Sequence, residues 1–148
     1  MNTYEFVKES NRIEGIKREP TKAEIDAHDE FIDFSQLSIE AICKLVSVYQ
    51  PDAKLRTETG MNVRVGNHYP PRGGMHIQYQ LEALLSEIND GGASPYKAHC
   101  EYETLHPFTD GNGRSGRVVW AWMMFNQHNG YPLGFLHHFY YQALQAIR

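Results

Sequence analysis

The sequence predicts an all-α fold, a bundle of helices that carries one short β-hairpin. Several stretches repeat apolar residues at intervals of three and four, as the buried face of a helix does. Residues 61–74 instead alternate apolar and polar side chains and then turn at a Gly-Asn pair. The chain has 148 residues, of which 41% are hydrophobic and 22% are charged, so one domain with an ordinary core is expected over residues 1–148.

The first helix is expected over residues 3–13, because Gly15 follows it and can adopt the left-handed conformation that ends a helix. Thr21 and Glu24 have the spacing of a capping box, which predicts that a second helix begins just after Thr21. The side chains of this second helix that are expected to face the core are Ile25, Phe31 and Ile32.

Four more helices follow in the prediction. Apolar residues recur at helical spacing in residues 38–49 and again in residues 75–89. Ser94 and the proline after it supply a cap and a first-turn residue for the next helix, expected over residues 95–105. The last helix is expected from about residue 112, where the helical pattern resumes.

Residues 61–74 are the exception and predict a β-hairpin. Val63 and Val65 alternate with polar residues, as they would along a half-buried strand. Gly66-Asn67 is typical of a tight hairpin turn, and two prolines then end the pairing. An isolated hairpin is only marginally stable in water, so this one is expected to pack against the helices.

Composition argues against several classes of protein. The formal net charge of −4 argues against a dedicated DNA-binding protein. No apolar run approaches about 18 residues, and the N-terminal residues are too polar for a signal peptide, so a cytoplasmic protein without a membrane partner is expected. The chain has two cysteines, Cys43 and Cys100, and their spacing suggests neither a disulfide framework nor a structural zinc site.

Residues 105–119, LHPFTDGNGRSGRVV, join two expected helices and combine residues that suit phosphate chemistry. Gly111 and Gly113 allow the backbone to approach a ligand closely, and a loop that runs into a helix N-terminus presents free N–H groups to an anion. Arg114 and Arg117 are three residues apart, so both guanidinium groups project from one face of that helix. Because cations are unfavourable at a helix N-terminus, an anionic partner is expected there.

Asp110 and His106 add the other two groups that phosphoryl chemistry needs. Asp110 offers a hard oxygen ligand, and Mg²⁺ commonly binds one carboxylate together with phosphate oxygens and waters. His106 can act as a general base that takes a proton from an incoming hydroxyl. Each residue alone is more often an ordinary loop residue, but the combination predicts a site of phosphate chemistry.

The stretch from His106 to Arg117 matches the signature H-P-F-x-[DE]-G-N-G-R-x-x-R at every specified position, so the chain resembles the Fic-domain family. The resemblance implies a Fic-type helical bundle whose upstream hairpin, residues 61–71, is a flap. It also implies an enzyme that transfers AMP from ATP to a Tyr, Thr or Ser hydroxyl of a target protein, with Mg²⁺ or Mn²⁺ as cofactor.

The resemblance implies a role for each matching residue. His106 would be the catalytic base and Asp110 the metal ligand. ATP would be bound by Gly111, Asn112, Gly113, Arg114, Arg117, Tyr140 and Tyr141. Arg117 would hold the γ-phosphate, and Phe108 would anchor the loop in the core. The flap would pair with an extended target segment through Val65, Gly66, Asn67 and His68.

A second, remote motif, SNRIEG, ends the first expected helix. On its own, Glu14 is a solvated carboxylate beside the glycine that stops the helix, in an unfavourable place for the helix dipole. Beside the Fic signature, Ser10-x-x-x-Glu14-Gly15 resembles the family's inhibitory motif, placed here in an N-terminal helix within residues 1–15. The resemblance implies that Glu14 pairs with Arg117 and so occupies the cation that would otherwise bind the γ-phosphate.

Three alternatives to AMP transfer stay open. A Doc-like protein kinase would move the γ-phosphate, but Gly113 lies where such kinases have a lysine, which favours AMP transfer. Removal of AMP, with Glu14 aligning a water, is a reverse reaction of glutamate-bearing relatives. An interaction module that only binds nucleotide is disfavoured by the intact His106 and Asp110. The sequence identifies neither the target protein nor whether the chain forms homo-oligomers.

Overall fold

The computed structural model describes residues 2–128 and Leu144. Its described part holds six helices: α1 (Thr3–Ile13), α2 (Lys22–Ile32), α3 (Ile39–Tyr49), α4 (Met75–Asn89), α5 (Pro95–Leu105) and α6 (Asn112–His128). The all-α prediction is confirmed, and the helices begin and end close to their expected bounds. Within the same residues, no helix is both long enough and apolar enough to cross a lipid bilayer.

The two helix caps that the sequence predicts, at Thr21 and Ser94, are present. Thr21 and Glu24 form the predicted capping box, because the side chain of each accepts a hydrogen bond from the backbone N–H of the other (3.1 and 2.8 Å). The Ser94 hydroxyl caps α5. Asn2 and Glu5 form a further capping box at the start of α1. These caps satisfy backbone donors that the first turn of a helix leaves unpaired.

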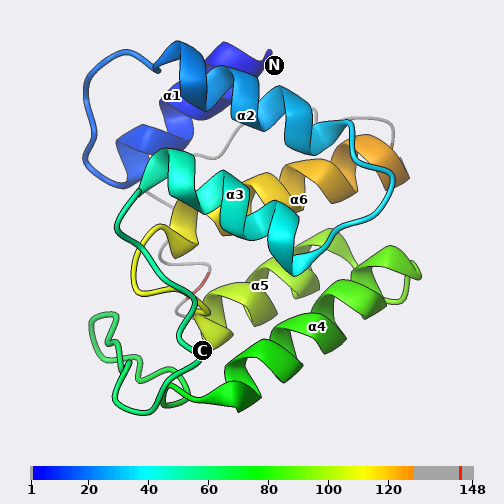
Figure 1. The fold of residues 1–148 in the computed structure, drawn as a ribbon. Coiled ribbons are helices and arrows are strands. Elements are labelled where there is room, and N and C mark those ends of the chain that lie inside the picture. The colour runs from blue at the N-terminus through cyan, green and yellow to red at the C-terminus, as the bar shows by residue number, and fades with distance from the viewer. Residues whose placement is uncertain (1, 129–143, 145–148) are drawn as a thin grey trace.

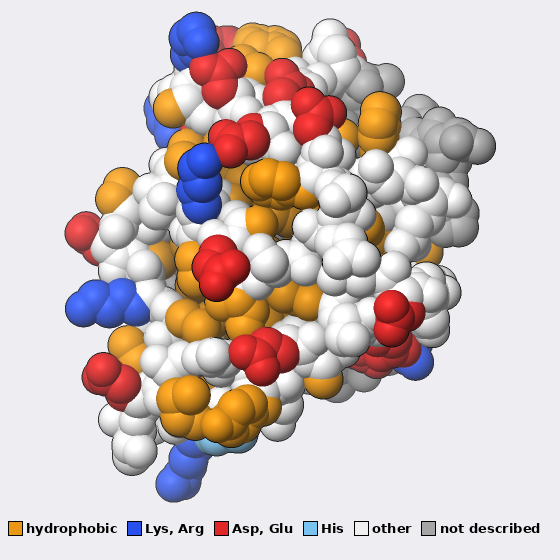
Figure 2. Space-filling model, turned by 45° about the vertical axis from the view of Figure 1, so that its right-hand side comes forward, with side chains coloured by type: hydrophobic (Ala, Val, Ile, Leu, Met, Phe, Trp, Pro, Cys, Tyr) orange, Lys and Arg blue, Asp and Glu red, His pale blue; other side chains and the backbone are white. Residues whose placement is uncertain are grey.

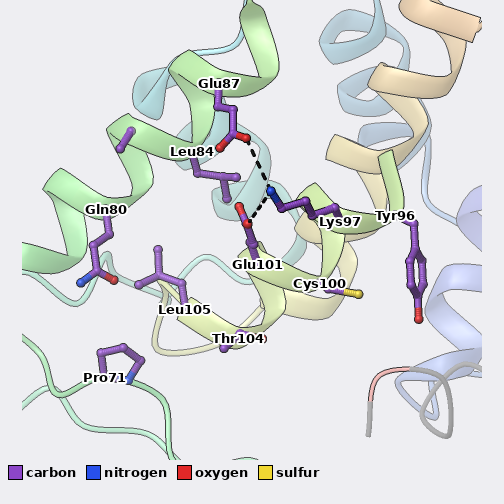
Figure 3. Close-up of a pocket in the computed structure, with 11 residues that line it drawn as sticks. Pro71, Gln80, Leu84, Glu87, Tyr96, Lys97, Cys100, Glu101, Thr104 and Leu105 are labelled. Carbon is purple, nitrogen blue, oxygen red and sulfur yellow. Dashed lines mark ion pairs between the residues drawn. The ribbon is translucent and has the colours of Figure 1, made fainter. Parts of the chain in front are cut away.

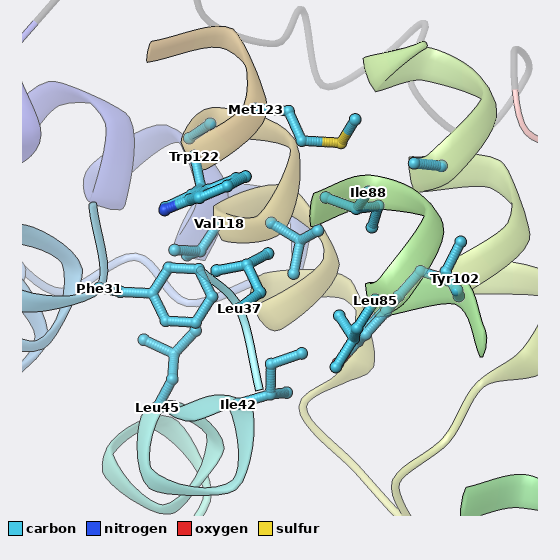
Figure 4. Packing of buried hydrophobic residues seen from close by; sticks show 14 of the residues in the cluster. Phe31, Leu37, Ile42, Leu45, Leu85, Ile88, Tyr102, Val118, Trp122 and Met123 are labelled. Carbon is cyan, nitrogen blue, oxygen red and sulfur yellow. The ribbon is translucent and has the colours of Figure 1, made fainter. Parts of the chain in front are cut away.

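Helix α6 is the central element of the bundle and contacts α1, α2, α3 and α5 (Figure 1). Figure 4 shows Val118, Trp122 and Met123 of α6 in the core, between residues of α2 and α3 on one side and residues of α4 and α5 on the other. The indole N–H of Trp122 donates to the carbonyl of Phe34 (2.8 Å), which satisfies its polar atom inside the core. Helix α6 is therefore packed against other helices on several sides.

The core face of α2 differs in part from the prediction. Phe31 and Ile32 are buried as expected, but Ile25 is only half-buried. The same helix instead buries Glu24 and His28, two residues that a hydrophobic pattern cannot place in a core. Burial of Glu24 is tolerated because arginine side chains neutralise its carboxylate.

His28 makes the stability of the fold depend on pH. Its ring lies 5.0 Å from the ring of Phe6, and burial lowers the pKa of His28 from 6.5 to about 4, although Asp29 opposes the shift. The unfolded chain takes up a proton near pH 6.5 and the folded chain only near pH 4. The free energy of unfolding should therefore fall, by up to about 3 kcal/mol, as pH drops from 6.5 to 4.

Urea unfolding at a series of pH values measures this effect. His28→Phe removes the buried imidazole, so its stability should fall less steeply than that of the parent between pH 6.5 and 4. The exposed His76 is the matched control, and His76→Phe should keep the parental slope. Equal slopes for the parent and His28→Phe would show that His28 does not carry the pH dependence.

The prediction of two paired strands in residues 61–74 is wrong, because the structure has no β-strand in this segment. In the flap segment (residues 61–71), the structure pairs Val65 with His68 in one isolated bridge, through hydrogen bonds of 3.0 and 2.8 Å. Gly66 between them has φ of 58°, so the predicted tight turn is present. The two prolines have no N–H with which to extend the pairing, and the carbonyls of Met61 and Pro71 accept hydrogen bonds from the Arg56 side chain instead.

Candidate active site

The loop between α5 and α6 is fixed by backbone pairing and by one asparagine. His106 caps α5 with φ of 51°, a left-handed conformation that few residues other than glycine adopt. The side chain of Asn112 accepts from the N–H of Phe108 and donates to its carbonyl, both at 2.8 Å. Phe108 is buried in the core and forms a bridge with Leu55, as expected for the anchor of the loop. The side chain of Asn112 thus closes the loop onto Phe108.

A cavity of roughly 670 Å³ opens over this loop. It is lined by Glu14, Ile16, Arg18, Tyr49, Gln50, Val63, Arg64, Val65, His106, Thr109, Asp110, Gly111, Asn112, Gly113 and Arg114. The lining therefore comes from the end of α1, the end of α3, the flap segment and the loop before α6. The fold brings the predicted base, the predicted metal ligand and the predicted phosphate-binding loop to one space.

Arg114 is held in place by protein groups. Its guanidinium lies 5.0 Å from the centre of the Tyr49 ring and donates to the Tyr49 carbonyl (3.3 Å). The carboxylate of Glu24 is 3.8 Å away and is itself bound by Arg18 (2.9 Å). Burial lowers the pKa of Arg114, whereas the nearby carboxylates, Glu14 first among them, raise it. Arg114 thus presents a preorganised cation at the wall of the cavity.

Arg117 lies on the same helix but is not part of the cavity lining in the described structure. Its side chain is 0% exposed, and Nε donates to the Ser10 hydroxyl (2.7 Å). Nη2 donates to the Ser10 carbonyl (3.0 Å) and to Glu14 Oε1 (2.6 Å). The predicted pairing of Glu14 with Arg117 is therefore present, and it covers this cation on the side of α1.

Glu14 lies directly against the phosphate loop. Its side chain is 31% exposed and lines the cavity. A Cβ atom added to Gly113 would collide with Oε1 of Glu14 and would crowd the Arg117 guanidinium. A side chain at position 113 would therefore displace the carboxylate from its present place.

Asp110 is exposed at the edge of the cavity. One of its oxygens accepts a hydrogen bond from the Gln50 amide, and the other accepts from the Gly111 N–H (2.7 Å). Among the described residues, no three His, Cys, Asp or Glu side chains gather into a metal-binding group. One carboxylate beside a phosphate loop suits Mg²⁺, which usually completes its shell with phosphate oxygens and waters.

The flap segment reaches both the cavity and α5. Val65 lines the cavity, and Gly66 and Asn67 form the exposed tip of the turn. The ring Nε2 of His68 lies 3.0 Å from the carbonyl of Thr104, so the flap is docked on the last turn of α5. The other two predicted ATP-binding residues, Tyr140 and Tyr141, lie outside the described residues.

The sequence model of the Fic/DOC family matches residues 25–124, which is more than half of the chain. The chain belongs to the Fic/DOC family. Fic/DOC proteins are typically enzymes that transfer a nucleotide monophosphate to proteins, and they generally use ATP and a divalent metal ion. The match begins within α2, covers α3 to α5, the loop and most of α6, and does not include Ser10 or Glu14.

Several residues of this Fic/DOC cavity were not found by sequence reasoning. Arg18, Tyr49 and Gln50 line it, yet their spacing carries no signal that links them to the signature. Glu24 was recognised as a cap, but its second role as the anion between two arginines depends on packing. Arg56 donates to the carbonyl of His106, and no pattern in the sequence links these two residues, which are 50 positions apart.

A second cavity of roughly 670 Å³ lies between α4 and α5 and is mostly apolar (Figure 3). Leu84 and Leu105 point toward it, and Lys97 forms long ion pairs at its edge with Glu87 (3.9 Å) and Glu101 (3.8 Å). Figure 2 shows one face of the molecule, on which hydrophobic side chains gather in bands among acidic ones. The Fic signature runs from His106 to Arg117, and none of its residues lines this second cavity. The candidate active site is therefore the cavity over the loop.

Proposed function

We propose that this Fic/DOC protein is an autoinhibited protein adenylyltransferase, which transfers AMP from ATP to a Tyr, Thr or Ser hydroxyl of a target protein. The observation that carries the proposal is the cavity in which His106, Asp110 and the loop Gly111–Arg114 share one wall, with Glu14 seated on that loop. A base, a metal ligand and an anion cradle are the parts that transfer between phosphate and hydroxyl groups requires.

In the proposed reaction, His106 takes the proton of the target hydroxyl. The oxygen then attacks the α-phosphorus of ATP, the bond from that phosphorus to the bridging oxygen breaks, and pyrophosphate leaves. The loop N–H groups and the Arg114 guanidinium bind the phosphate oxygens and stabilise their charge. A bound Mg²⁺ would neutralise phosphate charge, and Asp110 is the residue that would hold it.

The proposed target binds as an extended segment along the flap. The flap segment makes one bridge among the described residues, so its Val65 to His68 turn is not an inner part of a sheet. An added strand could pair with the backbone there, next to the cavity that Val65 and His106 both line. This pairing would bring a target hydroxyl to the base.

The proposed inhibition follows from the pairing of Glu14 with Arg117. The γ-phosphate of ATP and the Glu14 carboxylate would compete for the same guanidinium, and their negative charges would repel each other. With Glu14 in place, ATP would bind weakly or in an unproductive pose. We assign the N-terminal helix α1 as the inhibitory element for this reason.

The position of Glu14 also supports a second candidate, the removal of AMP from a modified target. Glu14 lines the cavity and is partly exposed, so it could orient a water toward the α-phosphorus. A Doc-like kinase is less compatible with the site, because a lysine at position 113 would collide with Glu14.

Parallel incubation with α-labelled and γ-labelled ATP tests the proposed function. Label from the α-phosphate, and not from the γ-phosphate, should become covalently attached to protein, including the chain itself. Glu14→Gly should be assayed beside the parent, so that inhibition is not mistaken for inactivity. Transfer of the γ label alone would identify a kinase. Binding of ATP without transfer of either label would identify a nucleotide-binding module.

A further inference from the structure

Arg56 is fully buried and does not line the candidate active-site cavity. Within the residues that the structure describes, no carboxylate forms an ion pair with it, and burial lowers the pKa of its guanidinium. A buried charge without an ionic partner costs several kcal/mol unless hydrogen bonds compensate for lost hydration. The hydrogen bonds of Arg56 must therefore explain its presence.

The guanidinium of Arg56 donates four hydrogen bonds, all to backbone carbonyls. Nε donates to the carbonyl of His106 (2.7 Å), and Nη2 donates to that of Leu105 (2.8 Å). Nη1 donates to the carbonyls of Met61 (3.0 Å) and Pro71 (2.8 Å). One side chain thus joins the end of α5 to both ends of the flap segment.

The first pair of bonds fixes the backbone of the proposed base. The last carbonyls of a helix have no partner within the helix, and a cation is favourable at that end. His106 has φ of 51°, a conformation that costs about 1–2 kcal/mol for a residue with a Cβ and persists only where its surroundings hold it. The bond from Arg56 to the His106 carbonyl is one such restraint, and it sets the direction in which the imidazole leaves the backbone.

The second pair of hydrogen bonds from Arg56 fixes the flap segment relative to the backbone of His106. Met61 and Pro71 begin and end the flap segment, and a single nitrogen of Arg56 binds the carbonyls of both. Among the described residues, the flap segment contains one bridge, between Val65 and His68. The hydrogen bonds from Arg56 therefore hold the two ends of the segment where paired strands would otherwise do so. The distance between the flap and His106 therefore depends on the Arg56 guanidinium.

We propose that Arg56 is a positioning residue for AMP transfer: its guanidinium holds the base and the target-binding flap in one frame. The inference rests on the proposed function, and Arg56 itself touches neither nucleotide nor target. Its loss should affect the chemical step more than ATP binding, because a misplacement of about 1 Å can cost about 10²-fold in rate.

Arg56→Lys and Arg56→Gln, each in a Glu14→Gly parent, test the proposal. Lysine keeps the charge but is a point donor, and glutamine has a planar amide with fewer donors, so neither can bind all four carbonyls. Folded variants should show kcat for automodification about 10- to 100-fold below the parent, with an unchanged KM for ATP. Trypsin should also cleave after Arg64, near the flap turn, faster than in the parent.

Arg72→Lys is the matched control, because Arg72 is exposed and follows the flap segment directly. It should keep the parental kcat and the parental cleavage rate. Absence of AMP transfer in the Glu14→Gly parent would contradict the proposed function, and this inference with it. With an active parent, three results would overturn the role of Arg56 alone: a parental kcat in folded Arg56→Lys, a loss explained by a raised KM for ATP, or failure of both Arg56 variants to fold.

Discussion

His106→Ala is expected to reduce AMP transfer by about 10²–10⁴-fold while ATP binding is largely kept. His106 lines the cavity, and its imidazole is the proposed base that accepts the proton of the target hydroxyl. The proposed ATP contacts come instead from the loop that follows, Gly111–Arg114, whose backbone is held by Asn112 and Phe108. Transfer from α-labelled ATP, measured in a Glu14→Gly background, gives the rate. Calorimetric titration with ATP gives the affinity.

The exposed His76 offers a matched control for this substitution, and His76→Ala should leave both quantities unchanged. Robust transfer by folded His106→Ala would mean that another group is the base. A parallel loss of ATP affinity would place His106 among the nucleotide contacts and would remove the reason for assigning it to the proton.

The local features of this fold could be predicted because their causes are local. Thr21 and Glu24 are three residues apart, and a capping box needs nothing else to form. The loop signature likewise carries its own geometry, since Gly111 takes a positive φ (78°) and Asn112 closes the turn with the backbone of Phe108. Contacts within a few residues of one another are the ones that a sequence pattern describes.

The features that were mispredicted or missed depend on partners that are distant in the chain. Residues 61–74 have the alternation of a hairpin, but the carbonyls of Met61 and Pro71 accept hydrogen bonds from the Arg56 side chain rather than from a facing strand. Ile25 has the apolar character of a core residue, yet Glu24 and His28 take the buried places on α2. No hydrophobic pattern encodes these outcomes, because each involves contacts with another segment: Arg114 for Glu24 and Phe6 for His28.

Glu14→Gly is expected to raise AMP transfer by roughly 10- to 150-fold, the factor that corresponds to a charged hydrogen bond of about 1.5–3 kcal/mol. Removal of the carboxylate frees the Arg117 guanidinium for the γ-phosphate and opens the space above Gly113. The same change removes a contact of the folded chain, so the free energy of unfolding should fall by about 1–3 kcal/mol. The fall is smaller than for a fully buried pair, because Glu14 is 31% exposed and Ser10 still binds Arg117.

The opposite signs of these two effects make the prediction specific, since most substitutions at a functional pair lower activity together with stability. ATP should restore part of the lost stability in Glu14→Gly, because its γ-phosphate takes the place of the carboxylate and ligands stabilise the state they bind. Asp90→Gly is the control, since Asp90 is likewise the C-cap of a helix, α4, is exposed and does not line the cavity. Its transfer rate should stay at the parental level. Equal or lower transfer by a folded Glu14→Gly protein would end the case for autoinhibition. Ser10 and Glu14 would then be contacts that hold α1 on α6 without controlling the site.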